Sequence, residues 1–221
     1  MGAEGNEPRR RYLVVEGPIG VGKTSLALRL AERLGGGLML EQADDNPFLE
    51  RFYDSPRAAA FPTQLHFLFQ RSRQLAELRQ GDLFREGPLI ADFMLEKDRL
   101  FAEINLDVDE LALYAQVYAR LAMEAPAPDL VVYLQAPVDV LLARIRRRDR
   151  PQERSIDAGY LQRLTDAYTA FFSRYDRSPL LIVNATELNP VEREEDLERL
   201  AGEIHSTRRG RRYFNPAPVF A

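Results

Sequence analysis

The chain has 221 residues, of which 45% are hydrophobic and 29% charged, a composition typical of one large globular α/β domain. The absence of cysteine excludes disulfides and thiolate metal sites, and a formal net charge of -4 argues against general nucleic-acid binding. No apolar run approaches the roughly 18 residues of a membrane span and the N-terminus has no secretory signal, so we expect a cytoplasmic protein without membrane contact.

The first predicted elements are a strand at 12–16 and a helix at 23–34, joined by a glycine-rich segment. Residues 17–24 read Gly-Pro-Ile-Gly-Val-Gly-Lys-Thr, which matches the phosphate-binding pattern G-x-x-x-x-G-K-[ST]. Its glycines leave backbone N–H groups free to surround a phosphate at a helix N-terminus. Lys23 would reach the β/γ-phosphates, and Thr24 would offer its hydroxyl to Mg²⁺. An ordinary glycine turn is the alternative. The residues that we expect to bind a nucleoside triphosphate are Gly17, Gly20, Val21, Gly22, Lys23, Thr24 and Ser25.

Apolar runs and helical patterns alternate along the rest of the chain. We predict strands at 38–41, 88–92, 130–134 and 180–184, and helices at 46–52, 59–80, 108–123, 137–148, 158–174 and 192–205. This order predicts a five-stranded parallel sheet with helices on both faces. Such sheets bind ligands beyond the carboxyl ends of their strands, where Glu41 and Asp92 stand. Each carboxylate would accept a proton from an attacking hydroxyl or hold Mg²⁺ through water, unless it is a surface or capping acid.

The predicted helix at 59–80 carries polar side chains on an apolar face. Phe61, Gln64, Leu68 and Arg71 follow one another at helical spacing, so they share that face. A buried amide and guanidinium need partners. Taken alone this is a weak signal for a nucleobase site.

Arginine far outnumbers lysine, and six arginines crowd between 144 and 154: Arg144, Arg146, Arg147, Arg148, Arg150 and Arg154. A helix that runs into Arg148-Asp149-Arg150-Pro151 resembles a lid whose guanidinium groups close over a triphosphate. The alternative is a solvated, arginine-rich helix face.

We divide the chain into a flexible N-terminus at 1–10, a single domain at 11–206 and a C-terminal tail at 207–221. The tail contains Arg208-Arg209-Gly210-Arg211-Arg212. We interpret this segment as a solvated terminus, with a phosphate or partner contact as the alternative.

Together these motifs resemble the deoxynucleoside kinase family over roughly residues 11 to 185. The resemblance rests on 17–25, Glu41, 46–53 (Asn-Pro-Phe-Leu-Glu-Arg-Phe-Tyr), Phe61…Gln64…Arg71, Phe101-Ala102 and Arg144…Arg148-x-Arg150…Glu153…Tyr160. It implies a phosphate-loop (P-loop) kinase-like fold with an arginine-rich lid, ATP as the donor, Mg²⁺, a nucleoside acceptor and a homodimer.

The resemblance also implies residue roles. Glu41 would be the general base that takes the proton of the deoxyribose 5′-hydroxyl. Tyr53 and Glu153 would bind the sugar 3′-hydroxyl, while Gln64 would bind the base edge with support from Arg71. The phosphates would be clamped from the lid by Arg144, Arg148 and Arg150.

One departure from the family pattern bears on the substrate. Many members have [DE]-R-S after the third strand, where this chain has Ala91-Asp92-Phe93, so Asp92 or Lys97 must act differently. This variant resembles the bacterial deoxyguanosine kinase branch and favours deoxyguanosine over deoxyadenosine. The alternatives are a nucleoside monophosphate kinase of the thymidylate kinase type, which would need Asp-Arg-[YH] there, and a nucleotide-dependent switch, which would need no acceptor pocket.

Overall fold

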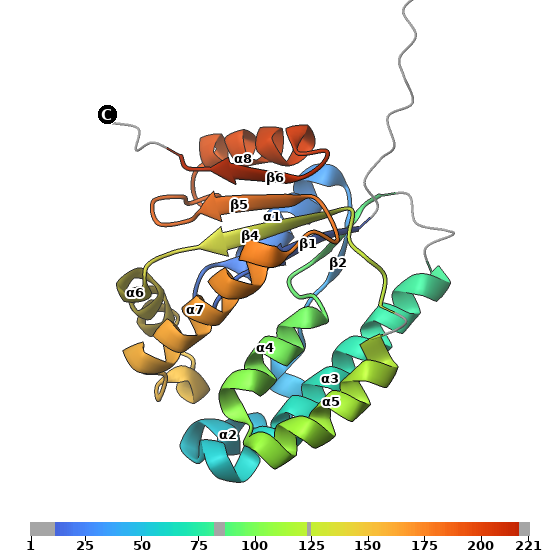
Figure 1. The fold of residues 1–221 in the computed structure, drawn as a ribbon. Helices are drawn as coiled ribbons and strands as arrows, with labels where there is room; N and C mark the ends of the chain where they lie inside the picture. Colours follow the sequence, from blue (N-terminus) through green and yellow to red (C-terminus); the bar gives the residue numbers. More distant parts are fainter. Residues whose placement is uncertain (1–11, 82–86, 123–124, 217–221) are drawn as a thin grey trace, which may run out of the picture.

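One parallel sheet organises the molecule. The computed structural model describes residues 12–81, 87–122 and 125–216 and arranges six strands in the order β2-β3-β1-β4-β5-β6 (Figure 1). The strands are β1 Tyr12–Glu16, β2 Gly37–Met39, β3 Leu89–Ala91, β4 Leu130–Gln135, β5 Leu180–Asn184 and β6 Arg211–Phe214. The predicted fold class is confirmed, with one strand more than the sequence predicts.

Helices connect the strands and cover the sheet. They are α1 Lys23–Leu34, α2 Leu49–Asp54, α3 Pro56–Gly81, α4 Glu96–Asn105, α5 Val108–Ala122, α6 Val138–Arg148, α7 Ala158–Arg174 and α8 Glu194–Ser206, with 3₁₀ turns at Ala43–Asp45 and Pro151–Glu153. Within the described residues, no helix combines the length and the apolar character that crossing a bilayer requires.

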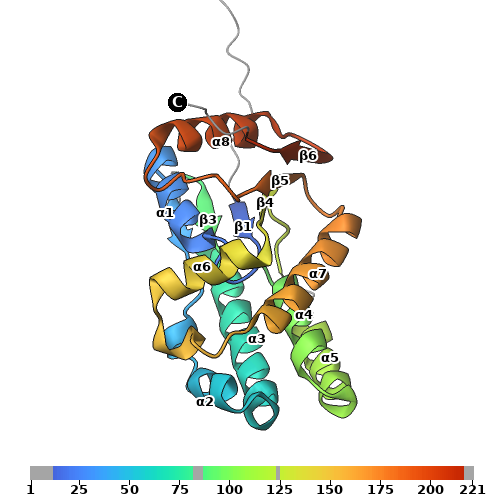
Figure 2. The ribbon, with the colours of Figure 1, turned by 90° about the vertical axis from the view of Figure 1, so that its left-hand side faces the viewer.

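Strand β1 shows how the two faces are built. Its side chains alternate, and all of them are buried, so each set packs into a different core. Leu13 and Val15 join the core that α1, α6 and α8 cover, whereas Tyr12 and Val14 join the core beneath α3, α4, α5 and α7. Figure 2 shows α1 and α8 on one side of the sheet and α3 to α5 on the other. A central strand buried on both faces explains the continuous apolar run in the sequence.

Helix α4 is absent from the sequence-based prediction, because its buried face does not look apolar. The residues that it buries are Lys97, Asp98, Leu100 and Ala102, so two of its four inward positions carry charges. Helical periodicity is read from apolar side chains, and it fails where a functional site replaces them.

Strand β6 lies within the segment that the sequence assigns to the C-terminal tail. It pairs in parallel with β5 at the edge of the sheet. The Arg211 guanidinium donates to the carbonyl oxygens of Phe172 and Ser173 at 2.9 Å each, and Arg212 forms an ion pair with Glu203 at 2.7 Å. These arginines therefore make contacts within the fold. The predicted flexible N-terminus, 1–10, and the last residues of the tail, 217–221, lie outside the described residues.

Candidate active site

The phosphate loop lies between β1 and α1, as the sequence predicts. Gly20 and Gly22 have positive φ angles of 84° and 104°, a backbone region that other residues rarely adopt. No side chain caps the N-terminus of α1, so its backbone N–H groups stay available for an anion. Lys23 Nζ donates to the carbonyl oxygens of Gly17 and Pro18 at 2.8 and 3.1 Å, and burial lowers the pKa of Lys23 to about 8. The loop is thus shaped to receive phosphate groups.

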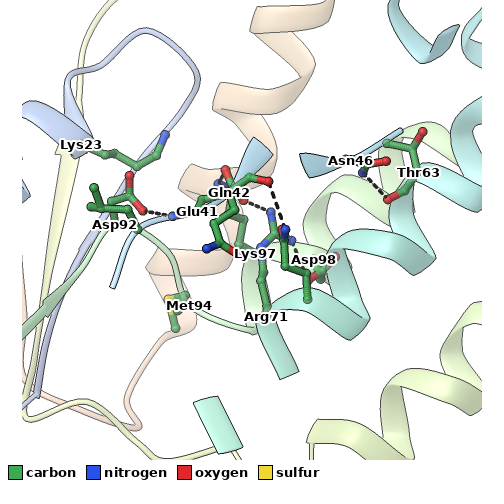
Figure 3. Close-up of polar contacts among 12 residues, drawn as sticks. Lys23, Glu41, Gln42, Asn46, Thr63, Arg71, Asp92, Met94, Lys97 and Asp98 are labelled. Atoms are coloured by element: carbon green, nitrogen blue, oxygen red, sulfur yellow. Dashed lines mark hydrogen bonds and ion pairs between the residues drawn. The ribbon is translucent and has the colours of Figure 1, made fainter. Parts of the chain in front are cut away.

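Asp92 connects the phosphate loop with the segment after β2. Strand β3 lies between β1 and β2, so a side chain at its carboxyl end reaches the loops that follow both neighbours. One Asp92 carboxylate oxygen accepts from the Thr24 hydroxyl. The other accepts from the Glu41 backbone N–H at 2.7 Å (Figure 3). Asp92 is buried. It therefore fixes Thr24 and Glu41 relative to each other.

The Glu41 carboxylate lies between two buried cations. It accepts from the Arg71 guanidinium and from Lys97 Nζ, whose distances to its two oxygens are 2.8 and 3.1 Å (Figure 3). The side chains of Arg71 and Lys97 are each 4% exposed, and that of Glu41 is 19% exposed. Burial opposes ionisation of Glu41, but the charges of Arg71 and Lys97 outweigh it and hold the pKa of this carboxyl well below its usual range. Glu41 is therefore an ionised acceptor.

Beyond Glu41, the same network ends in a group of buried polar atoms. Arg71 also pairs with Asp98, which is fully buried, and its guanidinium lies 4.9 Å from the centre of the Phe67 ring. Burial raises the pKa of Asp98 to about 6, although the Arg71 charge opposes that change. Within the described residues, Gln64 Oε1 and Arg71 Nε are buried without a hydrogen-bond partner. Buried polar groups are normally paired, so these atoms fit a site that expects a polar ligand.

Tyr53 and Glu153 lie on one wall of the same cavity, where α2 contacts the 3₁₀ turn Pro151–Glu153. Glu153 is 8% exposed, and Arg148 Nη2 binds both of its carboxylate oxygens at 2.6 Å. Tyr160 also lines this wall, and its hydroxyl accepts from the Asn105 amide at 3.3 Å. The wall thus presents a carboxylate and two phenols to the cavity.

A single cavity of about 500 Å³ collects the residues that the sequence singles out for the acceptor. These are Glu41, Tyr53, Gln64, Arg71, Asp92 and Glu153. Lys23, Thr24, Arg148 and Arg150 line it too, so the phosphate loop and the end of the predicted lid border this cavity. Its volume is that of a small-molecule site.

A second cavity, of about 680 Å³, opens on the other side of the phosphate loop, between α6 and the segment after β5. Val21, Gly22, Ser25, Arg144 and Arg148 contribute to its lining. The Arg144 guanidinium donates to the carbonyl oxygens of Val21 at 3.2 Å and Ala185 at 2.7 Å. In this structure Arg144 therefore joins the phosphate loop to the segment after β5, and its predicted contact with phosphate stays a prediction.

The comparison with protein families agrees with this geometry. Residues 13–207 match the family model described as deoxynucleoside kinase. The chain belongs to the deoxynucleoside kinase family. It is accordingly an enzyme that phosphorylates deoxynucleosides.

Characterised relatives cover nearly the whole of this deoxynucleoside kinase. It is 32% identical to a deoxyguanosine kinase of Bacillus subtilis over 197 residues, which span 87% of this chain and 95% of the relative. It is 27% identical to a deoxyadenosine/deoxycytidine kinase of the same organism, over 90% of this chain and 94% of the relative. Among solved structures, deoxyadenosine kinase from M. mycoides with bound dATP matches with a TM-score of 0.77 and 25% identity, over 89% of this chain and the whole of that one.

The sequence alone assigns no role to two charged residues that belong to the network around Glu41. The sequence singles out Lys97 beside Asp92 without defining its role, and it gives no indication of Asp98. Both residues lie at the start of α4, so their burial could only have been inferred from the sequence if that helix had been predicted. The available signal was a lysine beside an aspartate in a segment that otherwise suits a helix.

Proposed function

We propose that this kinase transfers the γ-phosphoryl group of ATP to the 5′-hydroxyl of a purine deoxynucleoside, and that deoxyguanosine is its preferred acceptor. The observation that carries the proposal is the order of groups along one cavity. A series of contacts runs from Arg71 through Glu41 to Asp92 and Thr24, so Arg71 stands at one end of it and the phosphate loop at the other. Gln64 lines the cavity from the same helix as Arg71. A nucleoside that lies with its base at the first end would present its 5′-hydroxyl to Glu41 and the phosphate loop.

In the proposed reaction, Glu41 accepts the proton of the 5′-hydroxyl as that oxygen attacks the γ-phosphorus. Phosphoryl transfer demands mainly positioning and neutralisation of charge. Lys23 would meet the charge that develops between the β- and γ-phosphates, while Arg148 and Arg150 would approach the transferring group from the lid. Tyr53 and Glu153 would hold the sugar through its 3′-hydroxyl, because they line the same cavity as Glu41 and Gln64.

The donor set beside the phosphate loop suits Mg²⁺. The Thr24 hydroxyl contacts the Asp92 carboxylate, and magnesium prefers such oxygen ligands. Within the described residues, no three His, Cys, Asp or Glu side chains form a cluster that could hold a metal alone. Phosphate oxygens and water would therefore supply most ligands of the ion, and Thr24 would contribute one. Bound there, Mg²⁺ would neutralise charge on the triphosphate.

The Arg71 guanidinium is the feature of the cavity that favours guanine over adenine. Guanine presents two acceptors, O6 and N7, along one edge, whereas adenine places a donor beside N7. Arg71 lines the cavity with an unpartnered donor atom, which suits two acceptors. The Gln64 amide offers a donor and an acceptor, so it can bind either purine. The higher identity to a deoxyguanosine kinase than to the deoxyadenosine/deoxycytidine kinase of the same organism supports the same preference.

An assay across all four deoxynucleosides tests the proposed substrate. We expect kcat/KM to be highest for deoxyguanosine, lower for deoxyadenosine and lowest for pyrimidines. The reason is that a site built to bind the edge of one base leaves its own polar groups without hydrogen-bond partners when a different base enters. Gln64→Leu should lower kcat/KM for purines roughly 30-fold, which corresponds to a loss of about 2 kcal/mol of transition-state stabilisation.

The matched control is Gln162→Leu, which removes an exposed amide on α7 outside both cavities. It should leave kcat/KM unchanged. A pyrimidine or deoxyadenosine preferred tenfold over deoxyguanosine would contradict the base preference, and phosphorylation of deoxynucleoside monophosphates instead of nucleosides would contradict the acceptor class.

We further propose that the enzyme acts as a cytoplasmic homodimer. Helix α5 fully buries only Tyr114 among its residues and exposes Val108 by 80% and Leu113 by 51%. Such apolar side chains on an outer helix suit contact with a second copy. Sedimentation velocity should find a species of twice the 25.3-kDa chain mass, and a single 25.3-kDa species would contradict the dimer.

A further inference from the structure

Only two of the 30 Lys and Arg residues in the chain are lysines, Lys23 and Lys97. Both line the acceptor cavity. Lys23 belongs to the phosphate loop, but no part of the proposed function employs Lys97. Lysine and arginine differ physically, since an ammonium is a compact point charge and a guanidinium is a broad planar fork. A chain that otherwise uses arginine throughout thus carries its two compact cations at one site.

The position of Lys97 follows from the segment after β3. Phe93, directly after Asp92, is fully buried in the core shared with α3, α4 and α7, so it brings no polar group to the cavity. The chain then enters α4, and Lys97 lies in the first turn of that helix. Lys97 thus adds a cation to the cavity from α4, four residues after Phe93.

The contacts of Lys97 point to one carboxylate. Its ammonium lies 2.8 and 3.1 Å from the two oxygens of Glu41 and 5.7 Å from the centre of the Phe101 ring. Within the described residues, Glu41 is the one carboxylate with which Lys97 forms an ion pair, whereas Arg71 divides its guanidinium between Glu41 and Asp98. Lys97 is 4% exposed, and a buried ammonium without an anion is costly.

Glu41 needs such a partner, because regular structure does not hold it. Strand β2 ends at Met39, and the next 3₁₀ turn begins at Ala43, so Glu41 belongs to an irregular connection. Asp92 fixes its backbone N–H, but the direction of the carboxylate depends on Arg71 and Lys97. A general base must be directed at the proton that it accepts, and a shift of about 1 Å can cost roughly 100-fold in rate.

We propose that Lys97 is a positioning residue for phosphoryl transfer, which binds the Glu41 carboxylate and directs it towards the acceptor hydroxyl. The inference rests on the proposed role of Glu41. Lys97 acts through Glu41 rather than on the nucleotide, and the lysine thereby supplies from α4 the cation that the residue after Asp92 does not.

A double-mutant cycle tests this role. Lys97→Met should lower kcat by roughly 10- to 100-fold with KM for deoxyguanosine changed less than about threefold, because the base is misdirected while the base edge and sugar contacts remain. Lys97→Arg, which keeps the charge, should lose less than about tenfold. In a Glu41→Gln background, Lys97→Met should change kcat by less than about threefold, since the carboxylate that it positions is gone.

The control is Arg99→Met on the same helix, because Arg99 is 67% exposed in its side chain and pairs only with Glu103 among the described residues. It should leave kcat and KM unchanged. Equal losses from Lys97→Met in the wild-type and Glu41→Gln backgrounds would overturn the inference, because the lysine would then act independently of Glu41. Equal changes in kcat and KM, or a loss in Lys97→Arg as large as in Lys97→Met, would overturn it too. If Lys97→Met does not fold, Lys97→Gln takes its place in the cycle.

The outcomes also separate this inference from the proposed function. If Glu41→Gln remains active, the assignment of Glu41 as the base fails, whatever Lys97 does. If Glu41→Gln is inactive while Lys97→Met keeps full kcat, the proposed function stands and only the role of Lys97 is overturned.

Discussion

Glu41→Gln should lower kcat by roughly 10²- to 10⁴-fold, because the amide keeps the shape of the side chain but cannot accept the proton of the 5′-hydroxyl. Asp92 binds the backbone N–H of this residue, so the substitution should leave the connection after β2 in place. Binding of deoxyguanosine should be largely intact, since the proposed base and sugar contacts belong to other side chains. Steady-state kinetics with ATP and deoxyguanosine, together with calorimetric titration of the nucleoside, measure the two effects separately.

The matched control is Glu32→Gln on α1, whose side chain is 74% exposed and lies outside both cavities. Its kcat should equal that of the wild type. Thermal unfolding of Glu41→Gln is also needed, because the change removes a carboxylate between two buried cations. A folded Glu41→Gln enzyme that keeps more than about a tenth of the wild-type kcat would exclude Glu41 as the general base.

Local patterns explain why much of the fold could be predicted. The first strand is an apolar run that ends at Glu16, and the glycine spacing that follows is needed where Gly20 and Gly22 adopt positive φ angles. Because these features depend on neighbours in the sequence, β1, the phosphate loop and α1 lie where the pattern predicts. Strand β6 is absent from the sequence-based prediction because it consists of arginine and aromatic residues that are largely exposed. It lies at the edge of the sheet, where charged side chains are common.

The part of the candidate site that could be predicted from the sequence is the part that lies at the ends of the strands. Glu41 and Asp92 were placed together because carboxyl ends of parallel strands share one edge of a sheet, and the hydrogen bond from the Glu41 N–H to Asp92 agrees with that placement. The partners of Glu41 were not predictable in the same way. Arg71 and Lys97 come from different helices, and their meeting at one carboxylate depends on how α3 and α4 pack. Similarly, spacing in α6 does not reveal that Arg144 binds backbone carbonyls.

Lys23→Ala should abolish measurable turnover. The lysine opens the helix that follows the phosphate loop, where a positive charge meets the negative charge that develops between the β- and γ-phosphates. In this structure, among the described residues, its ammonium donates hydrogen bonds only to the carbonyl oxygens of Gly17 and Pro18, within the same loop. Removing it should therefore leave the thermal midpoint of the ligand-free enzyme nearly unchanged, while it removes the increase in midpoint that ATP produces in the wild type.

Arg33→Ala, a substitution at the other end of α1, is the matched control. Arg33 pairs with Glu194 and Glu198 at the surface, so its loss should change neither turnover nor the response to ATP, since exposed ion pairs contribute little. Two outcomes would contradict the role of Lys23. A ligand-free Lys23→Ala protein that unfolds well below the wild type would indicate a lysine that stabilises the loop, and an enzyme that still turns over at a substantial rate would mean that the triphosphate is neutralised by other groups. A destabilised Lys23→Ala protein would change the role of one residue. An active Lys23→Ala enzyme would assign the neutralisation of the triphosphate to Arg148 and Arg150, which border the same cavity.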